Sequence, residues 1–144
     1  MITEFEVLSN TFYIHKLDHR SNSPEKSQWT ITMDEEKDCF ITAFVKAKNA
    51  NWTQSNCCWG LHFDNGNVAY VGVTAKSNPE ERHLFIAKFV DSNINSRWHG
   101  YPADPCNQKQ QDIPPEVILN DRLAKKYLRP QVVRKIGRGQ KCKL

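Results

Sequence analysis

A single short segment combines the residue types that acid–base chemistry on a phosphodiester requires. Residues 97–104 read RWHGYPAD, so a histidine lies between two aromatic residues and close to an arginine and an aspartate. Histidine titrates near neutral pH and arginine stays charged, which suits proton transfer combined with stabilisation of an anion. We therefore interpret His99 as the candidate acid–base group, Arg97 as the phosphate stabiliser and Tyr101 as the third member of a candidate catalytic set.

The aromatic rings of the same segment suggest a nucleobase as the ligand. Trp98 and Tyr101 are suited to stacking on a base, and Gly100 would let the backbone approach a ligand closely. Asp104 is a further candidate for ligand binding. The structural alternative is that Trp98 and Tyr101 anchor the segment on a sheet, while backbone groups satisfy His99.

Two residues of the preceding apolar run are candidate auxiliaries. His83 begins the run at residues 83–90, and Lys88 lies within it. If Lys88 projects toward residues 97–104, its ammonium group would neutralise a phosphate. The alternative is an edge lysine whose aliphatic stem lies along apolar surface.

The formal net charge of +4 combines two parts of opposite sign. Residues 122–144, the basic tail, carry nine Lys and Arg and no acid, whereas residues 1–121 carry 11 Lys and Arg against 16 Asp and Glu. In one interpretation the tail contacts the phosphates of RNA, DNA or a nucleotide, with Arg134, Lys135 and Arg138 as ligand-binding residues. In the other, some of its cations pair with the acidic body, in which the run DEEKD at residues 34–38 is the densest anionic patch.

Several classes of site have no motif in this chain. Phosphate-binding P-loops, serine-hydrolase elbows and zinc-ligand spacings are all missing from the sequence, so we expect neither a cofactor nor a metal. The five cysteines include no CxxC pair, the N-terminal residues lack the features of a signal peptide, and no apolar run approaches roughly 20 residues. These observations predict a cytoplasmic protein with reduced thiols and no membrane partner.

The first two-thirds of the chain show the pattern of a β-rich body, residues 1–90. Asn65-Gly66 separates two apolar runs and favours a tight hairpin. The expected strands are residues 11–17, 29–33, 39–47, 59–63, 68–73 and 83–90.

The remainder divides into an irregular stretch and a helical segment. Residues 91–114 contain no periodic run and are interpreted as a functional loop. Residues 115–144 begin with a helix whose apolar face holds Leu119, Leu123 and Tyr127, ended by Pro130. Residues 131–136 form either a second short helix closed by glycine or a final strand. We expect one α+β domain over residues 1–144, with a mostly antiparallel sheet of about five strands followed by a C-terminal basic amphipathic helix.

The RWHGYPAD segment, the Pro114-Pro115 pair and the basic residues 134–142 together resemble a block in small uncharacterised bacterial and mobile-element proteins. The resemblance covers about 50 residues and implies no established activity, so no catalytic residue follows from it. The layout of a sheet followed by a basic helix is also similar, at the level of fold class, to small metal-independent toxin ribonucleases.

Two functional hypotheses follow. The first is a metal-independent nuclease or nucleotide-processing enzyme of a toxin or phage-defence type, acting through His99, Arg97 and Tyr101. The second is a non-enzymatic module, such as an antitoxin, inhibitor or adaptor, that binds nucleic acid or a protein partner through the basic C-terminal segment. The sequence leaves the oligomeric state open.

Overall fold

The computed structural model describes residues 3–49, 56–107, 111–119 and 127–144. Its main sheet has six strands, of which only β2 and β9 pair in parallel. In sheet order the strands are β1 (Glu4–Leu8), β2 (Thr11–Ile14), β9 (Arg97–Ala103), β8 (Ile86–Val90), β4 (Cys57–Asp64) and β5 (Asn67–Ala69).

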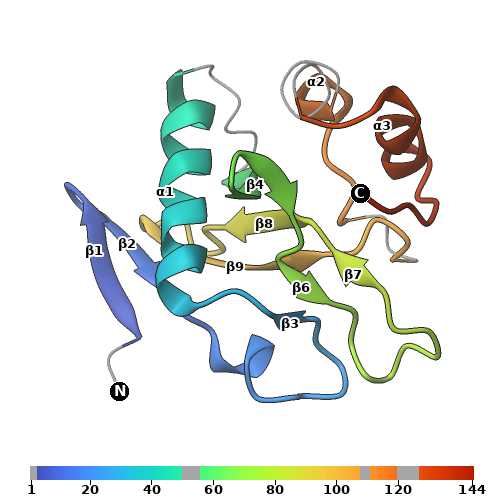
Figure 1. The fold of residues 1–144 in the computed structure, drawn as a ribbon. Coiled ribbons are helices and arrows are strands. Elements are labelled where there is room, and N and C mark those ends of the chain that lie inside the picture. Colours follow the sequence, from blue (N-terminus) through green and yellow to red (C-terminus); the bar gives the residue numbers. More distant parts are fainter. Residues whose placement is uncertain (1–2, 50–55, 108–110, 120–126) are drawn as a thin grey trace.

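A smaller antiparallel sheet and four helical segments complete the described chain (Figure 1). The strands of this sheet are β3 (Gln28–Trp29), β6 (Gly72–Val73) and β7 (His83–Leu84). The helical segments are the 3-10 turn η1 (Leu17–His19) and the helices α1 (Met33–Asn49), α2 (Glu116–Ile118) and α3 (Pro130–Gly137). The chain is therefore a mixed α and β protein, as expected, but it is not built from an antiparallel sheet followed by one helix.

Helix α1 occupies the segment where the sequence predicts a strand over residues 39–47. The helix begins with a capping box, because the Glu35 amide donates to Thr32 Oγ1 (3.1 Å) and the Thr32 amide donates to Glu35 Oε1 (3.0 Å). Its buried apolar residues Cys39, Phe40, Ala43 and Ala47 follow helical spacing. The strand prediction was wrong because this run, apolar on both faces of a strand, fits a buried helix as well as a central strand.

The structure also revises the expected loop at residues 91–114. Residues 97–103 form β9, which lies between β2 and β8 in the middle of the main sheet. The RWHGYPAD segment is thus largely a strand. The hairpin prediction is confirmed, because Asn65 and Gly66, with φ of 51° and 81°, connect β4 to β5.

Other strand predictions hold only in part. The run at residues 11–17 forms β2 and then turns into η1, and the run at residues 29–33 contributes only Trp29 to β3. The run at residues 83–90 divides into β7 and β8. No strand was expected at Glu4–Leu8, which forms β1.

The C-terminal segment forms α3, so the helical alternative for residues 131–136 is right and the strand alternative is wrong. Pro130 does not end a helix but starts one, in the first-turn position that tolerates a residue without an amide hydrogen. Of the helix expected before Pro130, α2 is described, whereas residues 120–126, including Leu123, lie outside the described residues.

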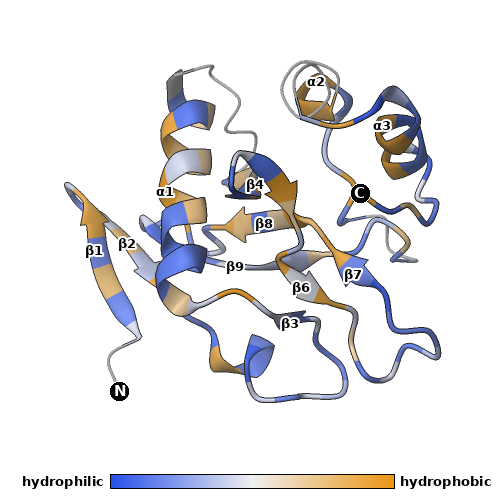
Figure 2. Cartoon of the chain, in the orientation of Figure 1, coloured by the Kyte–Doolittle hydropathy of each residue, from blue (hydrophilic) through white to orange (hydrophobic). Residues whose placement is uncertain are grey.

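The main sheet buries apolar side chains on both faces. Figure 2 shows hydrophobic residues along α1, β8 and α3, the elements that supply these clusters. On one face, Phe89 and Trp98 contact Phe40 of α1 in an aromatic cluster. On the other, Ile86 belongs to a second cluster that includes Ile136 of α3. The C-terminal helices are therefore held by their own hydrophobic core, which fixes where the basic tail lies.

One carboxylate lies inside the protein among polar partners. Glu36 of α1 is 1% exposed and accepts hydrogen bonds from the Tyr13 hydroxyl and from Arg20 (Nη2 2.8 Å, Nε 3.2 Å). His15 Nδ1 lies 3.2 Å from the same carboxylate. This buried charge is thus compensated within the fold.

Candidate functional site

Strand β9 divides the sequence-predicted residues between two faces of the sheet. Side chains alternate along a strand, so Arg97, His99 and Tyr101 share one face and Trp98 points to the other. Trp98 is 6% exposed and packs against Phe44 of α1 at a ring distance of 5.4 Å. It is a core residue, in line with the structural alternative, and offers no free ring face to a base.

Arg97 and His99 both have partners inside the protein. Arg97 Nε donates to Glu4 Oε1 at 2.9 Å, and its guanidinium lies 4.9 Å from the centroid of the Phe12 ring. His99 Nε2 lies 3.1 Å from Ser92 Oγ. Burial lowers the pKa of His99, and the nearby charge of Lys16 lowers it further, so the imidazole is neutral at pH 7.

Tyr101 is held by two residues that the sequence did not single out. Its hydroxyl donates to Asp112 Oδ1 at 2.8 Å, and its ring stacks on His19 at 5.3 Å between centroids. Burial raises the pKa of Tyr101 and the negative charge of Asp112 raises it further, so the phenol stays protonated. Lys88 reaches the neighbouring loop, where its ammonium donates to the Gln111 carbonyl at 2.6 Å.

These residues do not line one common cavity. A polar cavity of about 670 Å³ is lined by His19, Tyr101, Asp104 and Asp112, among others, but not by Arg97 or His99. The candidate catalytic set is thus split, with Tyr101 in a cavity and the other two members outside it.

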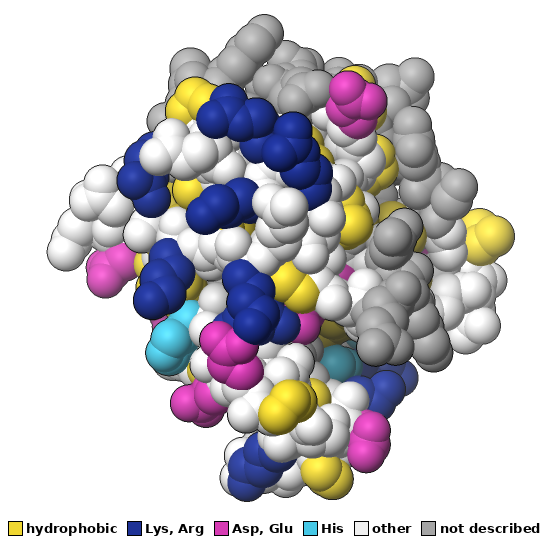
Figure 3. Space-filling view, turned by 90° about the vertical axis from the view of Figure 1, so that its right-hand side faces the viewer, with side chains coloured by type: hydrophobic (Ala, Val, Ile, Leu, Met, Phe, Trp, Pro, Cys, Tyr) yellow, Lys and Arg dark blue, Asp and Glu magenta, His cyan; other side chains and the backbone are white. Residues whose placement is uncertain are grey.

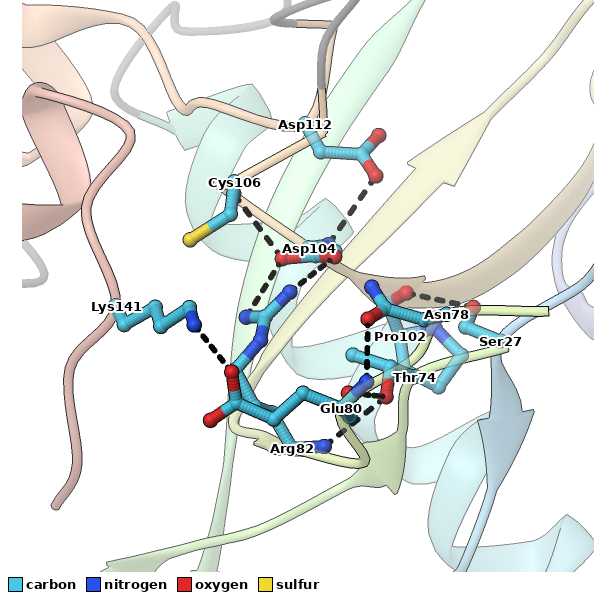
Figure 4. Close-up of polar contacts among 10 residues, drawn as sticks. All are labelled: Ser27, Thr74, Asn78, Glu80, Arg82, Pro102, Asp104, Cys106, Asp112 and Lys141. Carbon is cyan, nitrogen blue, oxygen red and sulfur yellow. Dashed lines mark hydrogen bonds and ion pairs between the residues drawn. The ribbon is translucent and has the colours of Figure 1, made fainter. Parts of the chain in front are cut away.

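Asp104, which lines this cavity, is paired with Arg82, which lines a second one. Figure 4 shows the polar contacts of the two side chains. Its carboxylate accepts two hydrogen bonds from Arg82, at 3.0 and 2.7 Å, and a third from the amide of Cys106. Asp112 in turn accepts the amide of Asp104 at 3.1 Å. This network fixes the end of β9 against the segment that leads into β7.

The second cavity, the basic pocket, has a volume of about 720 Å³ and lies between β7, α3 and the C-terminal segment. Figure 3 shows Lys and Arg side chains gathered on this side of the molecule. Its cationic lining residues are Arg82, Arg129, Lys135, Lys141 and Lys143. The acids Glu80 and Glu81 also line it, so cations outnumber acids in the pocket.

Three of these five cations form no ion pair with another described residue. Lys141 pairs with Glu80 and Arg82 pairs with Asp104. Within the described ranges, no carboxylate lies within ion-pair distance of Arg129, Lys135 or Lys143. Arg134 of α3 and Arg138, the residue that follows α3, are exposed outside the pocket lining and also form no ion pair with a described residue.

The acidic run at residues 34–38 does not neutralise the described part of the basic tail. Glu36 faces Arg20 in the core, Asp34 lies 3.8 Å from Lys37, and Glu35 lies 3.4 Å from His62. The described tail residues form a single ion pair, between Lys141 and Glu80. Among the described residues, the internal pairing that the sequence left open is thus limited to Lys141 and does not involve residues 34–38.

The end of α3 directs the C-terminal segment along the pocket. The Gln140 amide donates to the Lys135 carbonyl at 2.8 Å and the Gly139 amide to the Ile136 carbonyl at 3.0 Å, which is a Schellman cap. Gly139 adopts φ of +66°, and a Cβ there would lie 3.1 Å from the Pro105 carbonyl oxygen. Glycine is therefore required at the point where the chain turns back.

Two aromatic rings also line the basic pocket. His83, a sequence candidate, and Tyr70, which the sequence analysis missed, have ring centroids 5.2 Å apart. Tyr70 precedes β6 and belongs to no motif. Only the fold brings it next to the tail.

No group of three or more His, Cys, Asp or Glu residues in the described ranges is arranged to hold a metal ion. None of the described helices is both long enough and apolar enough to span a bilayer. No protein-family model matches the chain, and neither the curated proteins nor the solved structures include a significant match to it.

Proposed function

We propose that this protein binds the phosphate groups of nucleic acid through the basic pocket and the adjoining face of α3. The observation that carries the proposal is a group of three cations around one cavity, Arg129, Lys135 and Lys143, which form no ion pair within the described part of the chain. Like charges held together repel one another, and an anionic ligand relieves that repulsion. Phosphate contacts of this kind supply most of the sequence-independent affinity for nucleic acid.

Binding without turnover is favoured over nuclease activity by the separation of the two sets of candidate residues. A nuclease acting through His99 would need the phosphate to lie next to that ring. The basic pocket includes neither Arg97, His99 nor Tyr101 among its lining residues. Each of these three side chains also has an internal partner.

The proposal is tested by charge reversal in the pocket, read out by fluorescence anisotropy of a labelled oligonucleotide over a range of salt concentrations. The pocket variant carries Arg129→Glu, Lys135→Glu and Lys143→Glu. Loss of three phosphate contacts should weaken binding strongly and reduce the slope of log K against log salt by about 2.

A second triple variant controls for net charge alone. It reverses three exposed lysines that lie outside the basic pocket, Lys16, Lys26 and Lys76. This variant should keep most of the affinity. An equal loss in both variants would show that overall charge, not the pocket, governs binding, and the proposal would then be wrong.

Cleavage of the oligonucleotide in the same samples tests the competing nuclease hypothesis. If the wild type cleaves the oligonucleotide and His99→Ala does not, the protein is an enzyme and His99 is its acid–base group. We expect intact oligonucleotide with both proteins.

A further inference from the structure

The basic pocket contains more than charge, because Tyr70 and His83 present aromatic rings beside its cations. The two rings are inclined at 45° to each other. Tyr70 makes an edge contact with the buried ring of Phe85, whose centroid lies 6.3 Å away at 66°, and its hydroxyl accepts a hydrogen bond from the amide of Leu144. A ring held on two sides loses little conformational freedom when a ligand stacks on it.

A ligand that carried only phosphates would make no use of these rings. Inorganic polyphosphate, a sulfated sugar and a lipid headgroup all lack a flat aromatic group. A nucleobase has one, and stacking of a base on an aromatic side chain is tolerant of base identity. The cavity volume of about 720 Å³ lies within the range of nucleotide-sized ligand sites.

We infer that the basic pocket takes an unpaired nucleobase stacked on Tyr70, next to His83, so that the nucleic acid bound is single-stranded. This inference rests on the proposed function and specifies its substrate class. In a duplex the bases are stacked on one another and their faces are closed to the protein, whereas a single strand can turn a base outward. The cations Arg129, Lys135 and Lys143 then contact the phosphates that flank the inserted base.

Two of the cations that line the pocket beside these rings are already held in ion pairs. Arg82 is engaged by Asp104 and Lys141 by Glu80, so neither has to be released when a base enters. Glu81 adds one exposed carboxylate to the rim. Arg82 and Lys141 thus stay in their ion pairs at the pocket wall. Arg129, Lys135 and Lys143, which form no ion pair among the described residues, are left to contact the phosphates of the bound strand.

Three labelled ligands of equal length and charge distinguish the contribution of base stacking from that of phosphate contact in the wild-type protein. They are a 12-nucleotide single strand, the same backbone with abasic sites throughout, and a hairpin duplex with 12 nucleotides. We expect the single strand to bind more tightly than the other two. Equal binding of all three would overturn the inference and leave the proposed function standing, whereas binding of none at low salt would overturn the proposed function itself.

Substitutions of Tyr70 test the ring directly. Tyr70→Ala should weaken binding of the single strand by about tenfold and leave the abasic strand unchanged. Tyr70→Phe keeps the ring and should retain wild-type affinity. If Tyr70→Ala is misfolded by circular dichroism, Tyr70→Leu preserves apolar contact with Phe85 and should show the same selective loss.

The matched control is Tyr127→Ala, because Tyr127 is exposed and lines no part of the basic pocket. It should bind the single strand as the wild type does. His83→Ala should produce a smaller loss of the same kind as Tyr70→Ala. If the Tyr70 variants bind the single strand as tightly as Tyr127→Ala does, the pocket holds phosphate alone and the inference is wrong.

Discussion

Arg82 and Asp104 are joined by two parallel hydrogen bonds, and both side chains are 16% exposed. The pair ties the segment before β7 to the end of β9, and so connects the wall of the basic pocket to the centre of the main sheet. Bidentate pairs of this kind combine charge with fixed geometry, and they are stronger than exposed ion pairs.

We therefore expect Asp104→Ala to lower the free energy of unfolding by about 2 kcal/mol, because it leaves a mostly buried guanidinium without its acceptor. Urea denaturation measures this change. Glu4→Ala is the control, since it breaks the half-exposed pair with Arg97 and should cost about 0.5 kcal/mol. Equal losses of unfolding free energy in the two variants would show that the Arg82–Asp104 pair stabilises the protein no more than an exposed ion pair does.

The buried carboxylate of Glu36 should be essential for folding stability. Glu36→Gln keeps the shape of the side chain but removes the charge that faces Arg20, and loss of one partner of a buried pair costs about 3–5 kcal/mol. Thermal denaturation followed by circular dichroism provides the measurement. Asp38→Asn, on the exposed side of α1, should leave the melting temperature within a few degrees of the wild type. A comparable melting temperature for Glu36→Gln would contradict this account.

His99 should make stability fall as the solution becomes acidic. Its pKa is lower in the folded protein than in the unfolded chain, so the unfolded chain binds more protons and stability declines as pH drops below about 6.5. His99→Gln should reduce this decline. Denaturation midpoints between pH 5 and pH 8 test the effect, with the exposed His83→Gln as control. If the stability of His99→Gln depends on pH as that of the wild type does, His99 is not the cause of the decline.

Two glycines at the end of α3 should respond to alanine with opposite signs. Gly139 has φ of +66°, where alanine is strained, and Gly139→Ala should destabilise the protein by about 1–2 kcal/mol. Gly137 is helical and a Cβ there would lie at an ordinary 3.7 Å from Leu119, so Gly137→Ala should stabilise it by up to about 1 kcal/mol. Chemical denaturation of both variants measures the two changes in the free energy of unfolding. If both substitutions stabilise the protein, or both destabilise it, the assignment of a Schellman cap is wrong.

The sequence predicts the presence of the basic surface but not the pocket. The concentration of Lys and Arg identifies residues 122–144 as a basic segment, and His83 was already a candidate site residue. Tyr70, in contrast, lies in the pocket only because of the arrangement of β6 and β7. Spatial neighbours that are distant in the chain and share no motif give no local signal. The candidate role of His99 stays a prediction.

Two errors in the expected fold have specific physical causes. The helical signal of α1 was present in Thr32-x-x-Glu35, but the run that follows would be apolar on both faces of a strand, which also suits a central strand. The alternation in β9 was hidden because Gly100 and Pro102 occupy inward positions. Gly100 lies against the Phe89 ring, where a Cβ would come within 2.3 Å, so the strand requires a residue that is rare in strands.

The parallel pairing of β2 with β9 has a consequence for how the chain assembles. The hairpins of β1 with β2 and of β4 with β5 can form as soon as their own residues are available, whereas β2 has to wait for Arg97 and Trp98 before it pairs with β9. Closing so long a loop is entropically costly and slows folding. We therefore expect the first strands made to be the last to join the sheet, and the rate of that late step to limit how quickly the protein reaches its native state.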